Sequence, residues 1–147
     1  MAVGAPKPPV SFPDPTSHMH MVVNYLSAVG DELAFAIGDG TTRTIDSGVI
    51  SVSSSFHLIA GESSAADELD DIRGPDGAEG KGRLITGQRL TISPESDAIR
   101  VKNGTVGAAN PIRLDGGSDF EMDNTSDTLT LLWNGTSWLE VGRSVNT

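Results

Sequence analysis

The stretch that decides the fold runs Thr128-Leu129-Thr130-Leu131-Leu132-Trp133-Asn134-Gly135-Thr136-Ser137-Trp138-Leu139-Glu140-Val141. An Asn-Gly pair between two apolar, β-forming runs is a strong local signal for a β-hairpin. If Asn134 and Gly135 form a tight turn, one face of the hairpin carries Leu129, Leu131, Trp133 and Trp138, and the other carries Leu132, Leu139 and Val141. A four-residue loop would change the pairs, but both faces would still carry large apolar side chains.

Apolar side chains on both faces predict a hairpin that is covered on both sides. An antiparallel hairpin on the surface of a monomer should instead have one solvated face. The pattern therefore indicates either the interior of a sandwich or an interface between subunits, and both interpretations remain open. We assign Leu131, Trp133, Trp138 and Leu139 to this core or subunit seam.

Upstream of the hairpin, short apolar runs alternate with turn residues such as Asn103-Gly104 and Gly116-Gly117. This spacing predicts an all-β domain over residues 47–147, built as a compact β-sandwich, a barrel or a β-helical stack. Only 65–72 has helical composition, and we expect at most two helical turns there. The predicted strands are Val49–Val52, Phe56–Ala60, Arg83–Thr86, Arg89–Ser93, Ala98–Lys102, Pro111–Asp115, Asp119–Asp123, Thr128–Trp133 and Ser137–Val141.

Residues 1–17 differ from the rest because five of the eight prolines in the chain lie among the first fifteen residues. Prolines at this density favour extended, polyproline-like backbone with few amide donors, so the segment cannot build a core of its own. We expect an extended arm that becomes ordered by lying on another surface. Its predicted partner-binding residues are Val3, Pro8, Pro9, Val10, Phe12 and Pro13.

Residues 18–46 form the predicted connection between the arm and the β domain. Leu33, Phe35 and Ile37 alternate as a half-buried strand does. A strand or a short helix fits 19–28, and the pattern leaves both open. We therefore interpret 18–46 as a connecting β segment.

Composition argues against several classes of function. The chain has 20 acidic and 10 basic residues, a net charge of −10 and no cysteine. This acidic balance argues against a nucleic-acid surface, which needs clustered Lys and Arg, and it leaves no thiol chemistry. No apolar run is long enough to span a membrane, and Met1–Val10 lacks the pattern of a secretory signal.

No motif for catalysis or for a cofactor is present. The chain has no nucleophile elbow of the G-x-S-x-G type, no phosphate-binding glycine loop, and only three histidines to titrate near neutral pH. His18 and His20 are weak candidates for a metal, because two imidazoles are too few ligands for a closed site. The acidic run from Asp67 to Glu79 does not match a calcium loop, so we expect a solvated loop. We expect no enzyme activity and no cofactor.

The C-terminal third resembles the closing segment of virion proteins of tailed bacteriophages, a group that includes head decoration (cement) proteins, head fibres and tail fibres. The residues that carry this resemblance are Ile112–Asp123 and Asp127–Val141, and 56–92 looks like the preceding part of the same β domain. The first 46 residues do not take part. The matching motifs are turns and strands with no catalytic signature.

The resemblance implies a β-rich homotrimer that binds other virion proteins and performs no chemistry. We expect a decoration protein on the capsid exterior, made in the host cytoplasm, that binds the major capsid protein through the arm. The alternative is a head or tail fibre component that binds a host glycan by stacking exposed aromatic side chains on sugar rings. A polysaccharide-degrading enzyme would instead need two carboxylates facing each other across a groove.

Overall fold

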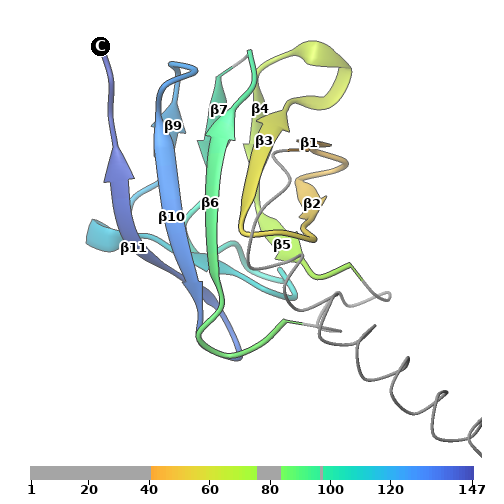
Figure 1. Ribbon diagram of the computed structural model, residues 1–147, viewed down its shortest axis with the longest axis vertical. Coiled ribbons are helices and arrows are strands. Elements are labelled where there is room, and N and C mark those ends of the chain that lie inside the picture. The colour runs from red at the N-terminus through yellow and green to blue at the C-terminus, as the bar shows by residue number, and fades with distance from the viewer. Residues whose placement is uncertain (1–40, 76–83, 97) are drawn as a thin grey trace, which may run out of the picture. The chain divides into compact units, whose positions relative to one another are not determined.

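The computed structural model describes residues 41–75, 84–96 and 98–147, which form a mostly β fold without an α-helix (Figure 1). This part therefore confirms the all-β class. Two 3-10 turns interrupt the strands: η1 (Glu62–Ser64) and η2 (Asp115–Gly117). The strands are β1 (Thr42–Thr44), β2 (Val49–Ser51), β3 (Phe56–Ala60), β4 (Asp67–Leu69), β5 (Asp71–Arg73), β6 (Arg89–Pro94), β7 (Ile99–Val101), β8 (Ile112–Arg113), β9 (Phe120–Met122), β10 (Thr128–Trp133) and β11 (Trp138–Ser144).

The largest sheet, called sheet A here, has the strand order β1-β3-β6-β10-β11-β8 and curls into a half-barrel (Figure 1). β1, β3 and β6 are parallel, whereas β10 runs antiparallel to both β6 and β11. Sheet B contains β2 and β5 in parallel. Sheet C has the order β4-β7-β9, with β4 parallel and β9 antiparallel to β7.

The first part of this domain winds through the three sheets in turn. From β3 the chain passes to β4 in sheet C, to β5 in sheet B and back to β6 in sheet A. Each of these strands lies parallel to a strand of the neighbouring turn, as in a β-helical stack. The antiparallel strands β9, β10 and β11 then complete sheets A and C.

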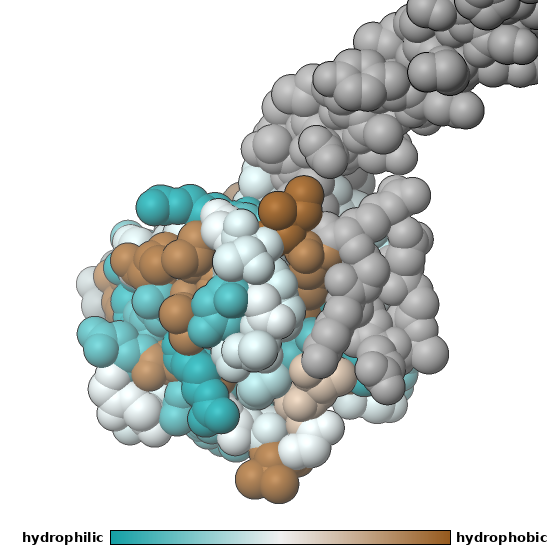
Figure 2. Space-filling model, turned by 90° about the horizontal axis from the view of Figure 1, so that it is seen from below, coloured by the Kyte–Doolittle hydropathy of each residue, from teal (hydrophilic) through white to brown (hydrophobic). Residues whose placement is uncertain are grey.

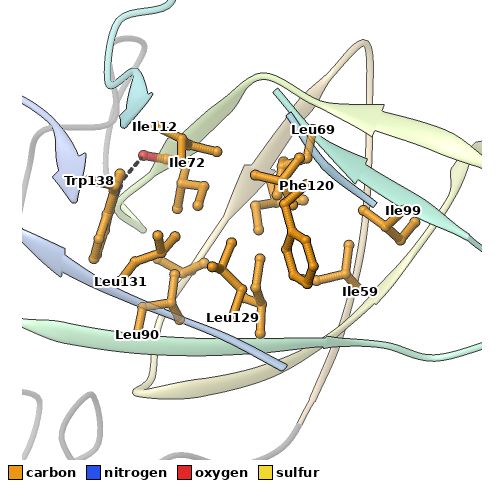
Figure 3. Packing of buried hydrophobic residues seen from close by; sticks show 14 of the residues in the cluster. Ile59, Leu69, Ile72, Leu90, Ile99, Ile112, Phe120, Leu129, Leu131 and Trp138 are labelled. Carbon is orange, nitrogen blue, oxygen red and sulfur yellow. Dashed lines mark hydrogen bonds between the residues drawn. The ribbon is translucent and has the colours of Figure 1, made fainter. Parts of the chain in front are cut away.

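One hydrophobic core lies inside the three sheets, because the strands turn alternate side chains inward. Ile59 from β3, Leu90 from β6 and Leu129 from β10 are fully buried there, together with side chains of the other sheets (Figure 3). In Figure 3, Phe120 and Leu69 reach the same interior from sheet C. This shared core explains how strands of only two or three residues persist.

The β10–β11 hairpin has a four-residue loop, so the tight-turn alternative is wrong. Trp133 pairs with Trp138 across the strands, and the Asn134 side-chain oxygen accepts hydrogen bonds from the backbone N–H groups of Thr136 and Ser137. The register shifts between Thr130 and Leu131, and the extra residue on β11 is Val141.

Three expectations from the sequence are wrong. Residues 65–72 hold β4 and β5 instead of a helix, because Leu69 and Ile72 enter the core from strands with parallel partners far along the chain. Residues 84–86 form no strand: the Ile85 carbonyl accepts from the Gln88 N–H, which closes a turn before β6. The strand predicted over Pro111–Asp115 is only Ile112–Arg113, because η2 begins at Asp115.

Several predictions concern residues outside the described part of the chain. These are the arm at 1–17, His18 and His20, and most of the connecting segment 18–46. The end of that segment is described, and its Thr42–Thr44 is strand β1, which pairs with β3.

Candidate interaction surfaces

The two tryptophans of the hairpin lie in the core. Their ring centroids are 5.4 Å apart with the planes tilted by 51°. Trp138 is fully buried, and its indole N–H donates to the Ile72 carbonyl oxygen at 3.0 Å (Figure 3). Trp138 therefore joins sheet A to sheet B, and neither indole offers an exposed surface for stacking.

Leu131 is fully buried, whereas Leu139 is half-buried on the opposite face of sheet A. That outer face is built from the residues that alternate with the core residues. One row across the sheet joins Phe56, Thr91 and Thr130, and the next joins Leu132 to Leu139. The hydroxyl oxygens of Thr91 and Thr130 lie 3.0 Å apart, as expected for neighbours on one face.

An open hollow of about 740 Å³ lies between β1 and β2, at the edges of sheets A and B. It is lined by Arg43, Arg73, Asp46, Val49 and the hydroxyl side chains of Thr42, Thr44, Ser47 and Ser51. The Arg43 guanidinium donates to the Ser53 hydroxyl, but its Nε is shielded from solvent without a hydrogen-bond partner. Arg73 is paired with the buried carboxylate of Asp71 at 3.0 Å.

The acidic residues of β4, of β5 and of the position between them do not form one loop. Asp71 is buried, and its carboxylate accepts from Arg73 and from the backbone N–H groups of Ala109 and Asn110. Asp70 accepts from the Thr105 hydroxyl at 2.7 Å. Asp67 accepts from the N–H groups of Glu62 and Glu68. The prediction of a single solvated acidic loop is therefore wrong for these described members.

The outer face of sheet C is charged. Arg100 lies between Glu68 and Glu121 in the strand register and forms an ion pair with each. Lys102 pairs with Asp119 at 2.8 Å. The backbone N–H of Asn103 and the Lys102 ammonium hold the pKa of Asp119 below its usual value, and Asp119 in turn raises the pKa of Lys102. This ladder is typical of a solvated face.

The Glu140 carboxylate and its partner Arg143 connect β11 to η2 and β9. Glu140 accepts from the Arg143 guanidinium and from the Asp115 backbone N–H, and these contacts lower the pKa of Glu140. The Arg143 guanidinium also lies 4.3 Å from the centre of the Phe120 ring. These residues link η2, β9 and β11, and sequence spacing alone gave no signal for the link.

The buried side chain of His57 holds backbone segments in place. His57 is fully buried, and its Nε2 faces the backbone N–H groups of Ser53 and Ser54 at 3.1 and 3.2 Å. Nε2 must therefore be the acceptor, so Nδ1 carries the proton and donates to the Thr41 carbonyl at 2.8 Å. With both ring nitrogens engaged, His57 positions backbone and leaves no nitrogen for a substrate.

Within 41–75, 84–96 and 98–147 there is no group of three or more His, Cys, Asp or Glu that could hold a metal ion. The same residues include no helix long and apolar enough to cross a membrane. No protein-family model, curated protein or solved structure matches the chain.

Proposed function

We propose that this chain is a bacteriophage capsid decoration protein that sits as a homotrimer on the capsid exterior and bridges neighbouring major capsid proteins. The observation that supports this proposal best is the apolar outer face of sheet A, on a body whose sheet C face is charged. A surface of this kind suits binding to protein rather than chemistry on a small molecule.

The mechanism is geometric. The proline-rich residues 1–17 would lie extended across the boundary between capsid proteins and add main-chain hydrogen bonds to exposed strand edges, while Val10 and Phe12 fill apolar pockets. Three arms held on one trimer act together, so each arm can be weak while the trimer binds strongly. The net charge of −10 keeps neighbouring trimers soluble and mutually repelling.

The burial of Trp138 bears on the alternative of a glycan-binding fibre. That alternative uses exposed aromatic rings to stack on sugars, and both tryptophans are at most 2% exposed. The polar hollow between β1 and β2 offers a glycan hydroxyl groups and two arginines, but no aromatic side chain lines it. We therefore favour the decoration protein.

The experiment is co-sedimentation of the full chain with capsid shells purified without their decoration protein, from the phage that carries this chain. The Phe12→Ala variant should bind these shells more weakly, because it loses an apolar anchor, while its β-sheet circular dichroism signal stays the same. Ser11→Ala is the matched control and should bind like the natural chain. Equal binding of Phe12→Ala and Ser11→Ala would contradict the role of the arm, and absence of binding by the natural chain would contradict the decoration function.

A further inference from the structure

We propose that the outer face of sheet A is the surface through which copies of this chain bind one another. This inference rests on the homotrimer in the proposed function and names the face that would build it. The face is formed by β3, β6, β10 and β11, which lie side by side in Figure 1. Its side chains are Phe56, Leu58, Thr91, Thr130, Leu132 and Leu139.

These side chains are accessible although most are apolar. All six are half-buried, whereas the residues that alternate with them, such as Ile59 and Leu131, are fully buried in the core. Val141 is the extra residue of the bulge beside them and is 46% exposed. The antiparallel pairs β6–β10 and β10–β11 would normally carry polar side chains on a solvated face, so apolar residues on both faces indicate a second covering surface.

The charge distribution favours another copy of the chain as the partner. The six side chains carry no charge, in a protein of net charge −10, so a contact between copies through them brings no carboxylates together. Arginines flank the row of Leu132 and Leu139: Arg89 pairs in register with Leu132, and Arg113 with Leu139. Both are exposed, which gives the apolar centre a basic rim that can meet the acidic surface of a neighbouring copy.

The other described surfaces are less suited to this contact. The outer face of sheet C carries paired charges, whose desolvation would oppose association. The end of the domain at the bottom of Figure 1 shows its hydrophobic residues in separate patches among hydrophilic ones (Figure 2). The 24 residues of β3, β6, β10 and β11, with strands spaced by about 4.8 Å and a rise of about 3.3 Å per residue, give the sheet A face a projected area of about 380 Å². This is about half of the roughly 800 Å² that each partner buries in a stable interface, and the side chains that project from the face add to it.

The first test is native mass spectrometry of the full chain and of its Leu132→Glu variant. We expect the natural chain near 46 kDa, about three chains of 15.3 kDa, and the variant at the mass of one chain, because the seam would desolvate one carboxylate from each copy and bring these like charges together. Val106→Glu is the matched control: Val106 is 100% exposed and lies outside the face, so this variant should keep the oligomer.

A second measurement avoids any loss of folding in Leu132→Glu. The chain has no cysteine, so Thr130→Cys and Val106→Cys each introduce a single thiol. Thr130→Cys should react with a bulky maleimide much more slowly in the oligomer than after dilution to monomers, whereas the rate of Val106→Cys should not change with dilution. A rate for Thr130→Cys that does not change with dilution, or an oligomer that persists in Leu132→Glu, would overturn the assignment of this face.

The same experiment distinguishes a second copy from another part of the same chain as the cover of this face. If the natural chain is a monomer and the thiol of Thr130→Cys is still protected from maleimide, another part of the same chain covers the face. That result would also overturn the inference. None of these measurements involves capsids. Failure of the sheet A seam is therefore distinguishable from failure of capsid attachment, which depends on residues 1–17.

Discussion

At the scale of the residue, Trp138 links two sheets with one side chain. Its ring packs beside Trp133 inside sheet A, and its N–H satisfies the buried Ile72 carbonyl of β5. A buried carbonyl without a donor is costly, so the hydrogen bond matters as well as the area of the ring.

We therefore expect Trp138→Ala to lower the free energy of unfolding by roughly 3–5 kcal/mol, through the cavity and the lost apolar area. Trp138→Phe should lower the free energy of unfolding by less than Trp138→Ala, because phenylalanine keeps most of the packing. It should still be less stable than the natural chain, because the Ile72 carbonyl loses its donor. Urea unfolding followed by tryptophan fluorescence and circular dichroism measures both. Stability equal to the natural chain in Trp138→Ala would contradict its place in the core.

The burial of hairpin residues was predictable from the sequence because strand alternation fixes which side chains share a face. Trp133, Trp138 and Leu131 belong to one face under either loop length, and all three are buried. His57 and Asp71 were not predictable as buried groups. Their burial depends on partners such as Ser53 N–H and Asn110 N–H, whose approach is set by the winding of the chain.

At the scale of the element, the turn before β10 is fastened by a buried carboxylate. Asp127 accepts from the backbone N–H of Asn124 at 3.1 Å and of Asn146 at 2.6 Å. These contacts, with Asn146 the main one, hold the pKa of Asp127 below its usual value. Asp127 thus joins the C-terminal residues to the turn that leads into β10.

The lowered pKa gives the sign of a pH effect. Because the folded-state pKa lies below the unfolded one, Asp127 stabilises the fold above the unfolded pKa of about 3.9 and loses this contribution as the pH falls through its folded value. Asp127→Asn should have a lower Tm than the natural chain at pH 7, and the difference should shrink below about pH 4. Thermal unfolding from pH 7 to pH 3 measures this, with Asp123→Asn as the control. A difference in Tm that is the same at every pH would contradict the role of the carboxylate.

Element boundaries were predictable where Gly and Asn mark turns, as at the hairpin loop after Trp133. They were not predictable for β4 and β5. Strands of three residues gain their stability from parallel partners about twenty to thirty positions away, such as Ile99 for Asp67 and Val49 for Asp71. The local composition does not indicate these long-range strand pairs, and the composition of Ala65 to Ile72 therefore resembled that of a helix.

At the scale of the whole molecule, the proposed function assigns attachment to two parts of the chain. The described β domain has a single core and presents the sheet A face, and we propose that the proline-rich residues 1–17 are the docking arm. The sequence placed Leu132 and Leu139 on one apolar face of the hairpin and left a sandwich interior and a subunit interface open. It could not place Phe56 and Thr91 beside them, because those residues are brought together only by the register of β3, β6 and β10.

The most direct measurement is electron cryo-microscopy of decoration-free capsid shells after incubation with the full chain. We expect density for three copies that meet at their sheet A faces on the outside of the shell, with extended arms that cross from one capsid protein to the next. Shells that carry no added density, or added density without arms that reach neighbouring capsid proteins, would contradict the proposal.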